Sequence, residues 1–262
     1  WSLSMFTSNN GLIQHYILPL IGDLKLNEIT SRVLEKYYLQ LLKTEAVPGI
    51  CRRKHQTGKV YVGAPTVRKV HNLLRSAFTQ ALKWDLMERN PATYATVPKF
   101  EEKKRDIWDA PTLFRAISLC QDERLKLCLN LAFACSLRMG ELLGLTWDCV
   151  DLSEESVMAG KASIFINKEL QRVSKTSMTA LEKKDIVAVF PEEHSQNRTA
   201  LVLKKPKTLT STRKIFLPKT VAEMLIVWKQ EQDIVRLALG EEYHDYTLVI
   251  ASSVGTPVEG SR

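Results

Sequence analysis

The sequence predicts a mainly α-helical protein with a small antiparallel β-sheet, arranged as a helical N-terminal domain followed by an α+β domain. Three observations predict this fold class. Apolar residues recur at three- and four-residue intervals through the first third of the chain. Short runs with the length and alternation of strands appear only after residue 160. A highly charged stretch without apolar periodicity separates the two parts.

Length and composition fit a globular protein of one large or two ordinary domains. The chain has 262 residues, of which 45% are hydrophobic and 25% charged. Its longest apolar stretch, 125–137, is interrupted by Lys126 and Asn130 and is too short to span a bilayer, so no membrane partner is expected. The chain begins at Trp1 and lacks the features of a signal peptide, so we expect it to start inside a longer protein.

The cysteine content indicates a reducing compartment. The number of cysteines is odd and no Cys-x-x-Cys pair occurs, which favours buried free thiols over disulfides or a zinc site. The five are Cys51, Cys120, Cys128, Cys135 and Cys149.

Positive charge is concentrated in two segments. The formal net charge is +8, but residues 43–83 hold nine Lys/Arg against Glu45 alone, and residues 196–219 hold seven Lys/Arg and no acid. Two such surfaces are typical of proteins that meet a polyanion, and nucleic acid is the commonest one inside cells. From charge alone, the alternative is that these two segments are solvated basic faces with no binding partner.

Two helices are predicted before the first basic segment. Residues 12–20 are apolar, and Gly22 closes the helix predicted there. Residues 31–42 carry an apolar stripe and follow Thr30, a residue type that commonly caps a helix start. Residues 44–64 are rich in Pro and Gly and predict a loop or a short hairpin.

A long amphipathic helix is predicted from Thr66. Its expected buried face consists of Val67, Val70, Leu74, Ala77, Phe78 and Ala81. The opposite face and the preceding basic loop carry cationic and amide groups able to contact a DNA groove or its phosphates. These predicted DNA-binding residues are Arg52, Arg53, Lys54, Arg68, Lys69, Asn72, Arg75 and Thr79. An ordinary solvated face is the alternative.

The predicted boundary divides the chain into residues 1–97, a linker at 98–106, and residues 107–262. The second domain opens with a helix start at Asp109, and a buried helix is expected over 125–134. Strands are predicted at 163–170, 200–204 and 213–217, the last two joined by a turn-rich 206–212, and a further helix at 220–239.

The segment after the predicted buried helix is the most informative. Residues 136–147 read Ser-Leu-Arg-Met-Gly-Glu-Leu-Leu-Gly-Leu-Thr-Trp, so Arg138 lies near a helix start whose following turn is anchored by apolar residues. A guanidinium held there is able to donate two parallel hydrogen bonds to phosphate oxygens. Glu141 lies one turn along the same face and is able to hold Arg138 or a neighbouring cation. A structural Arg–Glu pair is the alternative.

This segment resembles the first active-site box of tyrosine recombinases, particularly the integrases of phages and conjugative transposons. Residues 203–218, Leu-Lys-Lys-Pro-Lys-Thr-Leu-Thr-Ser-Thr-Arg-Lys-Ile-Phe-Leu-Pro, resemble the family's β-hairpin that bears a catalytic lysine. The two signals occur in the family's order. The resemblance implies a helical core-binding domain at 1–97 and the N-terminal part of the α+β catalytic domain at 107–262.

Carried over residue by residue, the resemblance makes Arg138 the first catalytic arginine, Glu141 its supporting acid and Lys207 the hairpin lysine. Lys207 is expected to protonate the leaving oxygen. The alternative is that Lys207 only makes one more contact to the DNA backbone. Neighbouring cations are expected to hold DNA phosphates; they are Lys204, Lys205 and Arg213.

The implied reaction cuts and rejoins DNA through a 3′-phosphotyrosine intermediate, with no metal or other cofactor. The expected partner is double-stranded DNA, bound by a homotetramer, in the cytoplasm of a bacterium and encoded by it or by a phage. Two alternatives stay open: a DNA-binding regulator without chemistry, and a type IB topoisomerase that relaxes supercoils.

The family's pattern continues with a His-x-x-Arg box and the tyrosine nucleophile, whereas this sequence ends at Arg262. We therefore expect a fragment that binds DNA but does not cleave it alone. The segment at His244 has Thr where the second Arg would stand, and Tyr243 and Tyr246 are interpreted as packing residues.

Overall fold

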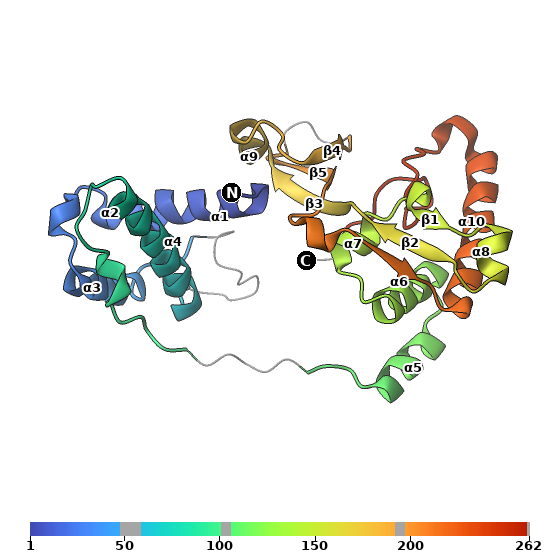
Figure 1. Cartoon of the computed structure of the whole chain (residues 1–262), viewed down its shortest axis with the longest axis horizontal. Coiled ribbons are helices and arrows are strands. Elements are labelled where there is room, and N and C mark those ends of the chain that lie inside the picture. Colours follow the sequence, from blue (N-terminus) through green and yellow to red (C-terminus); the bar gives the residue numbers. More distant parts are fainter. Residues whose placement is uncertain (48–58, 101–105, 192–196, 261–262) are drawn as a thin grey trace. The chain divides into compact units, whose positions relative to one another are not determined.

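A computed structural model describes residues 1–47, 59–100, 106–191 and 197–260. The chain divides into two compact units, Leu3–Arg105 and Asp106–Arg262, which are described separately (Figure 1). The first unit is helical, and the second combines helices with antiparallel strands. The predicted fold class is confirmed.

The first unit begins with a helical segment longer than predicted. The helix expected from residue 12 starts at Leu3, because the polar residues before Leu12 interrupt the apolar pattern without ending the helix. The described elements of this unit are α1 (Leu3–Leu12), a π-helical turn (Ile13–Ile17), α2 (Leu18–Ile21), α3 (Ser31–Leu41), α4 (Ala64–Lys83) and short 3-10 turns at Leu26–Glu28 and Pro91–Thr93.

Helices α3 and α4 supply most of the core of the first unit. The Oγ1 atom of Thr30 accepts a hydrogen bond from the backbone N–H of Val33, as the predicted cap requires. Buried side chains of α3 include Leu34 and Tyr38, and the predicted face of α4 is buried except for Ala77, which is exposed. The expectation for Ala77 was wrong because this residue lies at the edge of the apolar stripe.

The base of the predicted hairpin after α3 is present. The backbone N–H of Ala46 donates to the Val60 carbonyl over 2.6 Å, and that of Val62 donates to the Thr44 carbonyl over 2.9 Å. The predicted DNA-binding residues Arg52, Arg53 and Lys54 lie outside the described residues.

The second unit opens as predicted, with Asp109 accepting a hydrogen bond from Thr112 N–H over 2.9 Å at the start of its first helix. Its helices are α5 (Ala110–Leu119), α6 (Glu123–Ala134), α7 (Met139–Leu143), α8 (Glu154–Met158), α9 (Lys175–Ala180) and α10 (Lys219–Leu239). Its strands are β1 (Val150–Asp151), β2 (Ser163–Ile166), β3 (Glu169–Ser174), β4 (Ile186–Val189), β5 (Thr199–Lys204) and β6 (Arg213–Phe216).

Strand pairing corrects two expectations. Within the described residues the strands form two antiparallel sheets, β1-β2-β6 and β3-β5-β4. The single strand predicted at 163–170 is two strands, which follow one another along the chain in Figure 1. The strands β5 and β6 do not pair with each other, because β5 pairs with β3 and β6 pairs with β2. The segment 205–212 therefore connects strands of two different sheets and does not close a hairpin between β5 and β6.

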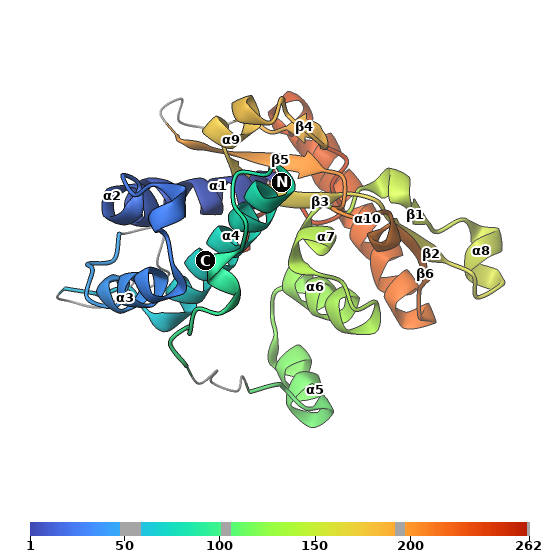
Figure 2. The same cartoon turned by 60° about the vertical axis from the view of Figure 1, so that its left-hand side comes forward.

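The core of the second unit packs α6 and α10 against the strands. The helices α6 and α10 lie side by side (Figure 2), and Leu131, Ile164 and Leu225 are fully buried. The helix predicted to be buried over 125–134 is buried on one face only, since Leu125 and Phe133 are each 49% exposed. One face of α6 is covered and the other is open.

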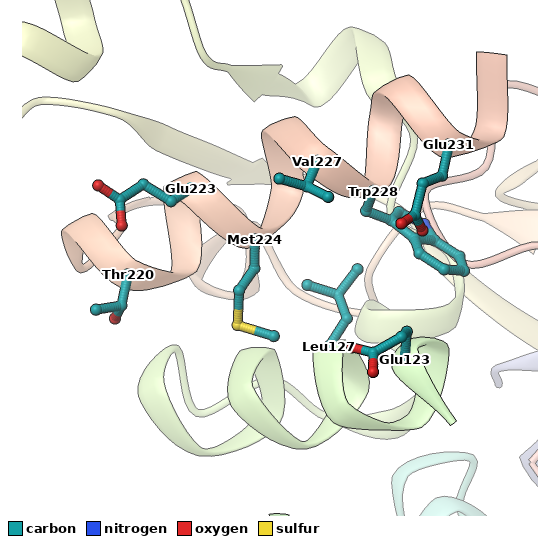
Figure 3. A pocket seen from close by; sticks show the side chains of 8 residues that line it. All are labelled: Glu123, Leu127, Thr220, Glu223, Met224, Val227, Trp228 and Glu231. Atoms are coloured by element: carbon teal, nitrogen blue, oxygen red, sulfur yellow. The ribbon is translucent and has the colours of Figure 1, made fainter. Parts of the chain in front are cut away.

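A groove of 330 Å³ runs between α6 and α10 (Figure 3). Leu127, Met224 and Trp228 line it together with several glutamates. None of the predicted site residues belongs to its lining.

The packing interpretation of Tyr246 is confirmed, because its ring meets that of Phe190 edge-on at 5.1 Å and packs against the core. The four described cysteines are free thiols. Cys135 and Cys149 are buried, whereas Cys120 and Cys128 are half-buried and so only partly match the expectation.

Candidate DNA-binding and phosphate site

Arg138 is presented to solvent at the first turn of α7. The chain leaves α6 through Ser136, which has a positive φ of 50°, a conformation unfavourable for a residue with a Cβ. Leu137 is 8% exposed and anchors the turn in the core. Arg138 then takes an extended conformation at the helix N-cap, and its side chain is 71% exposed. The local structure thus fixes the backbone of Arg138 while its guanidinium faces solvent.

Glu141 binds Arg138 through both of its carboxylate oxygens. The Glu141 side chain is 2% exposed. Its Oε2 accepts from the Arg138 backbone N–H over 3.1 Å, and its Oε1 accepts from Arg138 Nη1 over 2.8 Å. This is the contact that the sequence suggested, and the role of either residue in catalysis stays a prediction.

Arg213 binds the same carboxylate from the β6 strand. Its Nη2 donates to Glu141 Oε2 over 2.9 Å and its Nη1 donates to Glu141 Oε1 over 3.2 Å. Burial would raise the pKa of the Glu141 carboxyl, but hydrogen bonds from Arg213 and Arg138 outweigh it and lower that pKa below its ordinary value. Glu141 is therefore a carboxylate between two guanidinium groups. The same pairing raises the pKa of Arg213.

Two glycines let the β3 strand approach α7. A Cβ on Gly144 would lie 2.5 Å from the backbone N of Leu170 and 2.8 Å from the carbonyl C of Glu169. A Cβ on Gly140, one turn earlier, would lie 3.1 Å from the Leu170 carbonyl oxygen. The spacing of these glycines therefore allows backbone-to-backbone contact where Glu141 must be buried.

We expect Gly144→Ala to destabilise the protein by about 1–3 kcal/mol, because the new methyl group overlaps backbone atoms that have no rotamer to change. Gly140→Ala is the matched variant and should cost less. Urea unfolding of the whole chain, followed by Trp fluorescence, measures both. Equal midpoints for Gly144→Ala and the unmodified chain would contradict this account of the α7–β3 contact.

Lys207 lies on the segment 205–212 and is exposed. Hydroxyl groups order the rest of this segment: Thr208 Oγ1 lies 3.0 Å from Thr210 Oγ1 and 2.9 Å from Ser211 Oγ. Arg213 Nη1 donates to the Ser211 carbonyl over 3.1 Å, so the residue that binds Glu141 also holds the end of this segment.

The two lysines before Lys207 differ. Lys204 is 5% exposed, and its Nζ pairs with Glu169 Oε1 at 2.8 Å. This burial does not fit the predicted phosphate contact, because the ammonium is already covered and paired inside the protein. Lys205 is exposed and remains available.

The predicted DNA-binding face of α4 is exposed at Arg68, Lys69, Asn72, Arg75 and Thr79. The Thr79 hydroxyl is engaged within the protein: it donates to the Arg75 carbonyl over 2.8 Å and accepts from Asn90 Nδ2 over 2.9 Å. The Arg68 guanidinium lies 4.9 Å from the Phe100 ring centroid. The face is therefore cationic, and Thr79 serves mainly to hold Asn90.

No helix in the described ranges is both long and apolar enough to cross a bilayer. The described side chains also include no group of three or more His, Cys, Asp or Glu that could hold a metal ion.

Comparison with known proteins finds sequence relatives that are named integrase or tyrosine recombinase. No family model matches the sequence. The chain is 24% identical over 269 residues to a "Tyrosine recombinase XerC-like" protein of Caldanaerobacter subterraneus, covering 98% of this chain and 59% of that protein. It is 25% identical over 198 residues to the "ICEBs1 integrase" of Bacillus subtilis, covering 74% and 45%. An "Integrase" of Saccharopolyspora erythraea is 24% identical over 152 residues, covering 57% and 31%. The chain thus spans roughly one third to three fifths of the length of these relatives.

Solved structures show the same fold. The Tn1549 transposon integrase in complex with transposon right end DNA matches with a TM-score of 0.67 and 13% identity, covering 98% of this chain and 68% of that one. The same integrase in complex with a circular intermediate DNA also gives 0.67, with 12% identity and the same coverage. These matches confirm that the chain has the fold of a tyrosine-recombinase integrase. The names of the sequence relatives and this shared fold agree with the resemblance to tyrosine recombinases that residues 136–147 and 203–218 carry.

Proposed function

We propose that this chain is the DNA-binding and partly catalytic portion of a site-specific recombinase that cuts and rejoins double-stranded DNA through a 3′-phosphotyrosine. The observation that carries the proposal is the Arg138 site, in which an exposed guanidinium is held at a fixed backbone position by a buried carboxylate. The relatives named integrase and tyrosine recombinase, and the Tn1549 integrase solved with DNA, support it.

The proposed chemistry combines Arg138 and Lys207 of this chain with a tyrosine nucleophile. A tyrosine hydroxyl attacks the backbone phosphorus and releases its proton to solvent, the bond to the 5′-oxygen breaks, and that oxygen leaves as a hydroxyl after receiving a proton. The remaining donors of Arg138 bind the non-bridging oxygens and stabilise the charge that they gain in the transition state. Lys207 supplies the proton. One phosphodiester is exchanged for another bond of similar energy, so no nucleotide is consumed.

The helical unit would bind the duplex through α4. Four cationic or amide side chains stand exposed on one face: Arg68, Lys69, Asn72 and Arg75. Recombination joins two sites, each cut on both strands, which requires four copies on DNA. The names of the relatives support a mobile element as the setting, such as a phage or a conjugative transposon.

The α4 interface is tested by the salt dependence of DNA binding. We expect Arg68→Ala/Arg75→Ala to weaken binding of a duplex and to lower the slope of log affinity against log salt by about 0.9 per lost phosphate contact. Arg32→Ala/Lys36→Ala removes two exposed cations from α3 of the same unit and is the matched control. An identical slope in both double variants would move the binding surface away from α4.

A further inference from the structure

We propose that Arg213 is a positioning residue for Arg138: it occupies Glu141 through a two-point ion pair and thereby leaves the remaining Arg138 guanidinium donors to bind phosphate. This inference rests on the proposed function. It replaces the expectation from sequence that Arg213 itself contacts the DNA backbone.

The geometry distinguishes the two arginines. Arg213 gives two N–H groups to the two oxygens of Glu141, in the parallel arrangement that suits a guanidinium and a carboxylate. Arg138 gives one guanidinium N–H, through Nη1. The exposed fractions differ in the same sense, at 32% for the Arg213 side chain and 71% for Arg138. Arg213 is committed to Glu141, whereas most of Arg138 faces solvent.

The buried carboxylate makes this division of roles necessary. Glu141 is 2% exposed, and an unpaired buried charge is strongly unfavourable. Among the residues that the structure describes, Arg138 and Arg213 are the cations within ion-pair distance of Glu141. Without Arg213, Glu141 would draw both ends of the Arg138 guanidinium inward. Arg138 would then have fewer donors for a phosphate, although its charge is unchanged.

Arg213 also connects the two predicted catalytic segments. Its Nη1 binds the Ser211 carbonyl and Glu141 Oε1 at once, at 3.1 and 3.2 Å. Ser211 ends the segment that carries Lys207, and Glu141 holds Arg138. One side chain therefore fixes both segments to the same carboxylate.

The test compares the salt dependence of duplex DNA binding in variants of this chain. The variants are Arg138→Met, Arg213→Met, Glu141→Gln and the double variant Arg213→Met/Glu141→Gln. Arg115→Met removes an exposed arginine on α5 of the same unit and is the surface control. Thermal unfolding checks that each variant is folded. Arg213→Lys, which keeps the charge but loses the two-point contact, serves if Arg213→Met does not fold.

We expect Arg213→Met to lower the salt slope by about 0.9, as Arg138→Met does, because Arg138 is drawn away from its phosphate. Adding Glu141→Gln should restore the slope, since the carboxylate that captures Arg138 is gone. A direct Arg213–phosphate contact predicts the same loss in both backgrounds, and a purely structural role predicts no loss in either. Both outcomes would overturn the proposal. Absence of any DNA binding by the unmodified chain would instead refute the proposed function.

A pH series adds a readout that a structural role does not move. Without Arg213, the burial that raises the Glu141 pKa is opposed by fewer hydrogen bonds, so that pKa rises. Protonation of Glu141 then releases Arg138 as the pH falls. The salt slope of Arg213→Met should therefore recover toward that of the unmodified chain as the pH is lowered. A difference between the two proteins that stays constant as the pH is lowered would contradict the proposal.

Discussion

Replacing Arg138 with Ala should abolish most DNA cleavage while leaving DNA binding largely intact. The assay uses this chain joined to a C-terminal segment that carries a tyrosine nucleophile, called here the extended protein. Loss of one preorganised donor to the developing charge costs about 10²–10³ in rate. Loss of one phosphate contact among several changes affinity by less than about tenfold. Formation of the covalent adduct and a gel-shift titration measure the two quantities.

The conservative variant Arg138→Lys sharpens this prediction. Lysine keeps the charge but loses the planar fork, and it also loses the bond to Glu141 Oε1 that holds the side chain in place. We expect cleavage by Arg138→Lys to stay far below that of the unmodified extended protein. Near-normal cleavage by Arg138→Ala would reduce the 136–147 segment to a structural motif.

Replacing Lys207 with Ala should slow cleavage by about 10²–10⁴, the usual range for loss of a general acid. The departing 5′-oxygen is a poor leaving group and needs a proton as its bond breaks. Lys207 is exposed on a segment between two sheets, and Arg213 links the end of this segment to the carboxylate that binds Arg138.

A substrate with sulfur in place of the 5′-bridging oxygen isolates this step, because a thiolate leaves without protonation. The extended protein with Lys207→Ala should cleave this substrate at close to the unmodified rate, whereas Arg138→Ala stays slow on both substrates. Lys205→Ala is the matched control: a phosphate contact should lose the same factor on both substrates. If sulfur does not rescue Lys207→Ala, another residue is the general acid.

Sequence predicted best the features that depend on neighbouring residues. Arg138 and Glu141 are three positions apart at a helix start, so their contact follows from helix geometry. The caps at Thr30 and Asp109 are local in the same way. The resemblance to tyrosine recombinases also predicted the fold. Both of its motifs lie in segments of the second unit that pack onto one core.

The rest of the site depends on contacts between residues far apart in the sequence, and these could not be predicted from local patterns. Arg213 reaches Glu141 across 72 positions because β6 pairs with β2, and no local pattern encodes that pairing. The sequence predicts a phosphate contact for Lys204, but its ammonium is paired with Glu169 inside the protein. Lys204 ends β5, the central strand of its sheet, where the residues 200–204 are all buried and the usual alternation of faces does not hold. Its partner Glu169 lies opposite it on β3.

The central claim is that this chain serves phosphotyrosine chemistry on DNA, and adduct polarity tests it most directly. The extended protein is incubated with a duplex nicked near the cleavage site, so that the cut strand diffuses away and the adduct accumulates. We predict a covalent adduct on the 3′-phosphate with a free 5′-hydroxyl, lost in the Arg138→Ala variant. Tight DNA binding without any adduct, or an adduct on the 5′-phosphate, would contradict this account.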